Sequence, residues 1–202
     1  DIDAPTPESF AMEMERRAQL NAERQRNAVR SSLDTGKVAL GEENYARAIE
    51  KYNAIQPDFV LYETTRVRIA KAFVMAGDVD NANKALAAYA RFRDDNQIPS
   101  NRSDLQQARD GAIAEADFLQ AQILYWQARG NEQLGLQKTP TQYPEAIKKM
   151  RAYISNHGDD AANVPIAIEC IGRMHSDIGE LDRAEAAYAE LKPKDPPRAA
   201  RL

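Results

Sequence analysis

Apolar residues recur along most of this chain with the spacing of amphipathic helices. The pattern is clearest on either side of Gly77. Ile69 and Phe73 share one helical face, and Leu86 and Tyr89 belong to the face of a second pattern. Glycine readily adopts the left-handed conformation that ends a helix, and Gly77 lies between the two patterns. This stretch therefore predicts two helices joined by a tight turn.

The same hairpin pattern repeats with a period of 34 residues. The positions that match at this period are Gly36 and Ala70, Tyr45 and Val79, and Ala48 and Ala82. A small residue in the first helix lets the second helix approach closely, and the aromatic residue four positions after the second helix's alanine is expected to fill the space beneath the next unit. Three matched positions in one register indicate a true repeat.

The periodicity divides residues 29–191 into four helix-pair units. Their expected bounds are 29–57, 63–92, 112–156 and 165–191. Gly172 lies twelve residues before Ala184, and the same interval separates Gly36 from Ala48, so the fourth unit is in register. The third unit carries insertions, and its first helix does not align with the others.

Two polar insertions interrupt the repeats. Residues 93–111 include a loop that ends near Arg102, and a long helix is expected from Ser103 to about Ala128. Residues 130–142 form the second expected loop. In a chain that bound a small ligand, either insertion could close over the ligand as a lid.

Residues 1–28 and 192–202 lie outside the units. The first segment predicts a linker and then a charged helix from about Pro7 to Arg30. Its apolar stripe is thin and lacks sustained heptads, so we expect a solvated helix that caps the first unit; the alternative is an arm that pairs with another chain. The Pro-rich second segment predicts a tail or linker, because proline cannot continue a helix. A segment upstream of Asp1 could associate the chain indirectly with a membrane.

These features resemble the tetratricopeptide repeat family over about residues 29–92 and 112–191. The resemblance implies an all-α protein, built as a right-handed superhelical solenoid of helix hairpins with the charged helix at its N-terminus. It also implies a concave surface lined mainly by the first helix of each hairpin. The family's usual first-helix tryptophan is absent, and Ser32, Arg66 and Ile168 occupy its place.

A second resemblance concerns the spacing around Tyr143-Pro144 and the run 151–157. Both are similar to the divergent repeats of bacterial cell-envelope scaffold proteins. This resemblance implies the bacterial periplasm or cell envelope as the compartment, with the cytoplasm as the alternative.

Charge and composition exclude some classes of function. The chain has 202 residues and a formal net charge of −4, from 27 Lys and Arg against 31 Asp and Glu. Nucleic-acid binding usually needs a concentrated basic surface, so we expect no nucleic-acid partner. One cysteine cannot form an internal disulfide, and no apolar run reaches the ~18 residues of a membrane span.

Residues suited to catalysis or metal binding are few. Cys170 and His175 are five positions apart on an expected helix, so they share a face poorly and are expected to pack in the core. His157 falls in an expected turn and should be solvated. Two histidines and one cysteine are too scattered for a zinc site, and the glycines occur singly. We therefore expect no catalytic residue, metal or cofactor.

The resemblance to tetratricopeptide repeats implies a set of partner-binding residues on the first helices. These candidates are Arg30, Leu33, Asp34, Lys37, Thr64, Val67, Arg68, Lys71, Glu169 and Arg173. Some members of the family grip a peptide's terminal carboxylate, and Lys37, Arg68 and Lys71 supply the charge for such a grip. The alternative is that Asp34 and Arg68 pair with each other across adjacent helices.

The function expected from these patterns is a non-enzymatic scaffold that binds a peptide or partner domain on its concave surface. One alternative is a structural subunit of a large, possibly membrane-associated assembly. Another is a small-ligand-binding module that uses the insertions. The partner's identity and the oligomeric state do not follow from the sequence.

Overall fold

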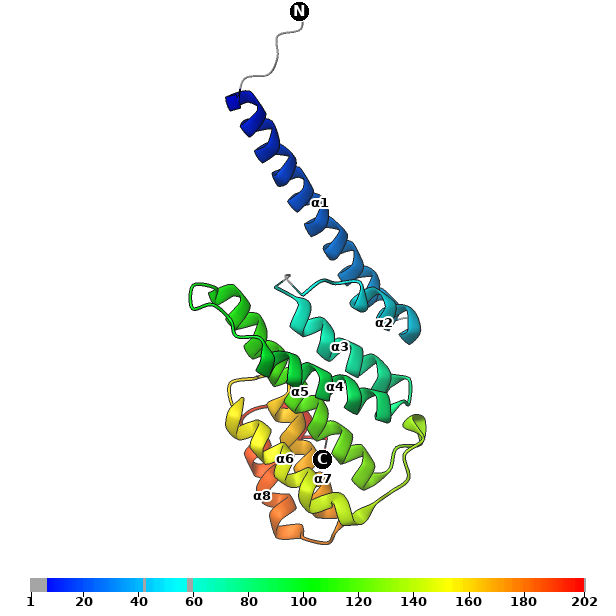
Figure 1. Cartoon of the computed structure of the whole chain (residues 1–202). Coiled ribbons are helices and arrows are strands. Elements are labelled where there is room, and N and C mark those ends of the chain that lie inside the picture. Colours follow the sequence, from blue (N-terminus) through cyan, green and yellow to red (C-terminus); the bar gives the residue numbers. More distant parts are fainter. Residues whose placement is uncertain (1–6, 42, 58–59, 202) are drawn as a thin grey trace, which may run out of the picture.

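The computed structural model describes residues 7–41, 43–57 and 60–201, and these residues form an all-α protein (Figure 1). The linker expected before Pro7 lies outside them. The helices are α1 Pro7–Gly41, α2 Tyr45–Asn53, α3 Tyr62–Met75, α4 Val79–Asp95, α5 Ser103–Arg129, α6 Tyr143–Asn156, α7 Val164–Asp177, α8 Leu181–Leu191 and α9 Pro196–Ala199. No sheet occurs in the described ranges, where one isolated bridge joins Asn131 to Leu136.

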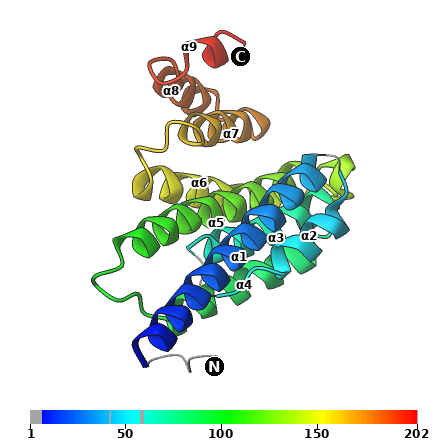
Figure 2. The same ribbon diagram turned by 90° about the horizontal axis from the view of Figure 1, so that it is seen from above.

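The helices pack in sequential pairs. The pairs are α1 with α2, α3 with α4, α5 with α6, and α7 with α8. Neighbouring pairs meet where α2 contacts α3, α3 contacts α5, and α6 contacts α7. Figure 2 shows α7, α8 and α9 following one another beyond α6, on the side of the molecule away from α1. The paired helices predicted from the periodicity are confirmed, and so is the long helix after the first insertion.

The first helix differs from its prediction. The charged helix expected to Arg30 and the unit expected from Val29 form one continuous α1 of 35 residues. No glycine or proline interrupts α1 between Glu8 and Thr35, so nothing in the sequence breaks the helix there. The helix expected to cap the first unit is therefore the N-terminal half of that unit's own first helix. This half of α1 projects beyond the body of the molecule (Figure 1).

Two glycines set how closely the paired helices approach. A Cβ added to Gly36 in α1 would lie 2.5 Å from a ring carbon of Tyr52 in α2. A Cβ on Gly172 in α7 would overlap the ring of Tyr188 in α8 even more severely. Each tyrosine follows its glycine by sixteen residues. The close approach predicted from small residues in the first helices is thus observed.

The second hairpin solves the same contact with different side chains. At the matching positions it carries Ala70 in α3 and Leu86 in α4, and both are buried. A methyl group fits where the facing side chain is an aliphatic one of smaller reach than a tyrosine ring. The turn after α3 is closed by Asp78, whose carboxylate accepts a hydrogen bond from the Asn81 backbone at 3.0 Å.

The C-terminal segment is not a simple tail. Residues 196–199 form the short helix α9, which packs against α8. The carboxylate of Asp195 accepts a hydrogen bond from the Arg198 backbone and caps this helix. The two prolines at the start of α9 occupy its first turn, where a missing N–H costs nothing. The expected tail therefore folds back, because proline starts a helix as readily as it ends one.

We predict that Gly172→Ala destabilises the protein by about 1–3 kcal/mol, because the new methyl group overlaps the Tyr188 ring. Replacing Tyr188 with leucine as well reproduces the Ala70–Leu86 pair of the second hairpin and should recover part of that loss. Urea unfolding measures both. Gly111→Ala is the control, since a Cβ there meets nothing within 4 Å; an equal loss in the control would contradict the packing explanation.

Candidate functional site

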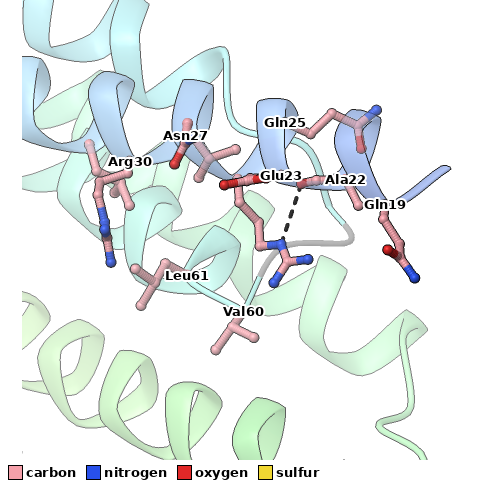
Figure 3. Close-up of a pocket in the computed structure, with 11 residues that line it drawn as sticks. Gln19, Ala22, Glu23, Gln25, Asn27, Arg30, Val60 and Leu61 are labelled. Carbon is pink, nitrogen blue, oxygen red and sulfur yellow. Dashed lines mark hydrogen bonds between the residues drawn. The ribbon is translucent and has the colours of Figure 1, made fainter. Parts of the chain in front are cut away.

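An open cleft lies between the middle of α1 and the residues just before α3 (Figure 3). Its volume is about 920 Å³. Its lining includes Ala22, Glu23, Arg26, Val29, Arg30, Leu33, Val60 and Leu61. The cleft exists because α1 continues past the first hairpin, so the helix has neighbouring chain on one side and solvent on the other.

The cleft combines an apolar surface with charges of both signs. Val29 and Leu33 supply the apolar surface from α1, and Leu61, 44% exposed, faces them across the cleft. Glu23 and Arg26 come from the same helix; the Nε of Arg26 donates to the Ala22 carbonyl oxygen at 3.3 Å. Such a surface suits a protein segment that carries apolar and charged side chains, since it offers burial and charge pairing together.

The predicted residues of the first unit divide between the cleft and the open surface. Arg30 and Leu33 line the cleft. Asp34 and Lys37 are exposed on the following turn of α1. Leu33 is only 6% exposed, so its side chain lies at the bottom of the cleft and offers a partner little accessible surface.

The predicted residues of the second unit are less accessible. Val67 is fully buried in the core, so its side chain offers no surface to a partner. Thr64 and Arg68 are half-buried, and only Lys71 is exposed. Sequence spacing placed Val67 on a shared face with Arg68 and Lys71, but α3 is covered on several sides because it contacts α2, α4 and α5.

The expected pair between Asp34 and Arg68 does not form. Among the described residues, no ion pair joins these two side chains, and Arg68 lies near the Tyr52 hydroxyl instead. Burial raises the pKa of Tyr52, and the positive charge of Arg68 partly opposes this rise. Arg68 therefore lies beside Tyr52 of the first hairpin, while Asp34 is exposed on the surface.

The predicted residues of the last unit are engaged by the chain itself. Glu169 pairs with Arg173, at 2.6 Å, and with Arg198 of α9. The side chain of Glu169 is 13% exposed as a result. The C-terminal helix therefore covers this part of the predicted surface, and Arg173 remains its more exposed member.

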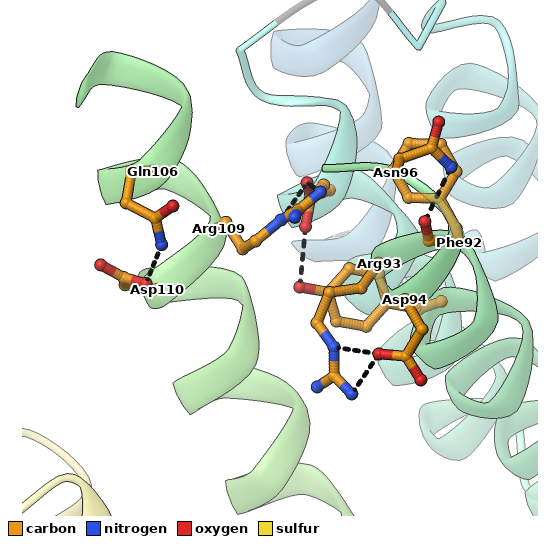
Figure 4. A network of polar contacts seen from close by, with 9 residues as sticks. Phe92, Arg93, Asp94, Asn96, Gln106, Arg109 and Asp110 are labelled. Carbon is orange, nitrogen blue, oxygen red and sulfur yellow. Dashed lines mark hydrogen bonds and ion pairs between the residues drawn. The ribbon is translucent and has the colours of Figure 1, made fainter. Parts of the chain in front are cut away.

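A buried polar cluster joins α3, α4 and α5 (Figure 4). Glu63 accepts hydrogen bonds from Arg109, at 2.7 and 2.8 Å, and from the Tyr89 hydroxyl, at 3.0 Å. Burial, together with the neighbouring Glu63 carboxylate, raises the pKa of Tyr89. Arg109 belongs to the first insertion, and its distance of 46 residues from Glu63 gave the sequence no signal of the contact.

A second pocket, of about 410 Å³, adjoins the insertion 130–142. Arg129 and Lys138 line it, and Asp177 accepts hydrogen bonds there from Arg129, at 2.5 Å, and from Tyr143, at 2.9 Å. Burial alone would raise the pKa of Asp177, but these two hydrogen bonds outweigh it and lower that pKa. Because the chain itself pairs Arg129, this pocket is a weaker ligand site than the cleft. The sequence indicated the insertion 130–142 as a possible lid, but it gave no signal for Arg129 or Asp177.

The cysteine and histidines are structural. Cys170 is buried, and burial raises the pKa of its thiol to about 12. His175 is also buried, with its Nδ1 2.7 Å from Glu180, so the prediction of core packing for both is confirmed. The prediction that His157 is solvated is wrong: its Nε2 lies 2.9 Å from Asp117, and its ring stacks on Tyr153.

Over residues 7–41, 43–57 and 60–201, no three His, Cys, Asp or Glu side chains gather as metal ligands would. In the same ranges no helix combines the length and hydrophobicity that a bilayer crossing needs.

Comparison with known proteins gave no match among family models, curated proteins or solved structures. The resemblance to tetratricopeptide repeats therefore rests on the residues of this chain alone.

We predict that Arg109→Met destabilises the protein by about 3–5 kcal/mol, because the carboxylate of Glu63 then stays buried without its cation. The double variant Glu63→Gln/Arg109→Met removes that stranded charge and keeps an acceptor for Tyr89. It should be more stable than Arg109→Met alone in urea unfolding. A double variant as unstable as the sum of both single variants would contradict the pairing.

The lowered pKa of Asp177 predicts acid sensitivity. The unfolded chain binds the proton near the ordinary pKa of 3.8, above the folded value, so this stabilisation is complete at neutral pH. It declines as pH falls below about 4 and through the folded pKa. Asp177→Asn should cost about 1 kcal/mol at neutral pH, and the difference from wild type should shrink in acid. Urea midpoints measure this, with Asp182→Asn in α8 as control; a gap independent of pH would refute it.

Proposed function

We propose that this chain is a non-enzymatic scaffold that binds a protein partner, built as a right-handed tetratricopeptide-like solenoid. The observation that carries the proposal is the cleft of about 920 Å³ beside α1. It offers apolar surface from Val29 and Leu61 beside the charges of Glu23 and Arg26, a combination suited to a protein segment. The recurring small residues of the hairpins support the family resemblance on which the rest depends.

The proposed binding surface extends from the cleft along the first helices. Arg30 lies in the cleft, and Lys37 and Lys71 are exposed beyond it. A surface preformed by packed helices loses little conformational entropy when a partner binds, so a modest contact area can suffice.

The test is capture of partner proteins from an extract of the source cells by the tagged chain with chemical crosslinking. We expect Leu61→Asp to reduce capture of proteins other than the chain itself by about tenfold, because it places a charge against the apolar side of the cleft. Leu61 is exposed enough for the fold to tolerate the change.

Leu181→Asp is the matched control, since Leu181 is 63% exposed at the start of α8, away from the cleft. The triple variant Lys37→Ala/Arg68→Ala/Lys71→Ala tests the extended surface in the same assay. Capture that survives both the Leu61 and the triple variants, or that falls equally in the Leu181 control, would remove the proposal.

A further inference from the structure

The projecting half of α1 lacks the packing that normally stabilises a helix. Side chains from Met14 to Arg30 are exposed apart from the partly buried Ala22 and Val29. Met12 is 67% exposed near the tip. Most helical stability in proteins comes from packing an amphipathic face against a neighbour, and the exposed side chains of this half of α1 supply little of that stability.

The stripe of α1 that lines the cleft from Gln19 onward also continues toward the N-terminus, and the whole stripe is self-complementary for an antiparallel copy of itself. Helix positions 12, 15, 19, 22, 26 and 29 alternate by three and four residues, so they form one stripe. In an antiparallel pair centred between positions 20 and 21, three kinds of contact form, each twice by symmetry. They are Met12 with Val29, Glu15 with Arg26, and Gln19 with Ala22.

We propose that a second copy of this chain occupies the cleft, with its α1 lying antiparallel along this stripe. The inference rests on the proposed function, because it names the partner that the cleft receives. Met12 of the second copy lies over Val29 and beside Leu61, where the cleft is apolar. Glu15 of the second copy pairs with Arg26, and the reciprocal contact pairs Arg26 of the second copy with Glu15.

Charge selects this arrangement over a parallel one. A parallel, in-register pair would place Glu15 against Glu15 and Arg26 against Arg26, and like charges at facing positions repel. The antiparallel pair instead matches opposite charges at both positions. The apolar surface on this stripe of α1 is small, and Val60 and Leu61 add to it from the other side of the cleft. The expected dimer is therefore weak, with a dissociation constant on the order of 10 μM.

Sedimentation equilibrium of the full chain tests the charge pairing. Glu15→Arg and Arg26→Glu each create two like-charge contacts and should weaken the dimer by about tenfold or more. The double variant Glu15→Arg/Arg26→Glu restores opposite charges and should recover the wild-type constant. Arg24→Glu is the control, because Arg24 is exposed on α1 and lies outside the stripe and the cleft lining. A double variant as weak as the single ones overturns the pairing.

Disulfide trapping tests the direction of the helices. In the antiparallel pair, Met12→Cys chains mixed with Val29→Cys chains should form a mixed disulfide. Met12→Cys alone should not crosslink, because its two copies would be about 25 Å apart along the helix axis. The native Cys170 is buried and should not form a disulfide under these conditions. Crosslinking of Met12→Cys with itself would indicate a parallel pair and overturn the proposal.

Self-association and partner binding fail in different ways. A chain that stays monomeric at about 1 mM overturns the second-copy proposal. If such a monomer still captures another protein, and Leu61→Asp reduces that capture, the proposed scaffold function stands without self-association. If the dimer forms but Leu61→Asp leaves capture of other proteins unchanged, the second copy is the partner of the cleft. The proposal that other proteins bind in the cleft is then overturned.

Discussion

Helix pairing in this protein depends on the absence of a side chain at two positions. The rings of Tyr52 and Tyr188 occupy space that a Cβ of Gly36 or Gly172 would need. This contact brings the backbones of each hairpin together and buries the ring that follows sixteen residues later. The second hairpin reaches the same result with Ala70 and Leu86, so the constraint is on combined volume and not on glycine itself.

The cleft follows from where this pairing stops. The Gly36 contact holds only the C-terminal part of α1 against α2, and the helix then continues outward because nothing in its sequence ends it. At the other end of the molecule, Arg198 closes the surface of α7 by pairing with Glu169. One end of the helical array is thus open and the other is covered by the chain's own last helix.

Much of the fold could be predicted, and less of the candidate site. Periodicity located the paired helices, and the glycine and alanine positions located their contacts. Periodicity did not indicate that Val67 is buried, since that burial depends on the contacts of α3 with three other helices. It also gave no sign that His157 contacts Asp117, a contact that leaves the histidine side chain 18% exposed. The continuity of α1 was missed because the predicted first unit begins at Val29, although nothing in the sequence breaks the helix there. The helix α9 was missed because its prolines indicated a linker.

The sequence by itself determined the helical class and the small residues Gly36, Ala70 and Gly172 at three of the helix crossings, because these depend on spacings within one hairpin. The tertiary structure decided which of the candidate residues are accessible. It also formed the contacts of Glu63 with Arg109 and of Arg129 with Asp177, which join residues 46 and 48 positions apart. Such contacts have no periodic signature, because they arise only when separate hairpins have already been brought side by side.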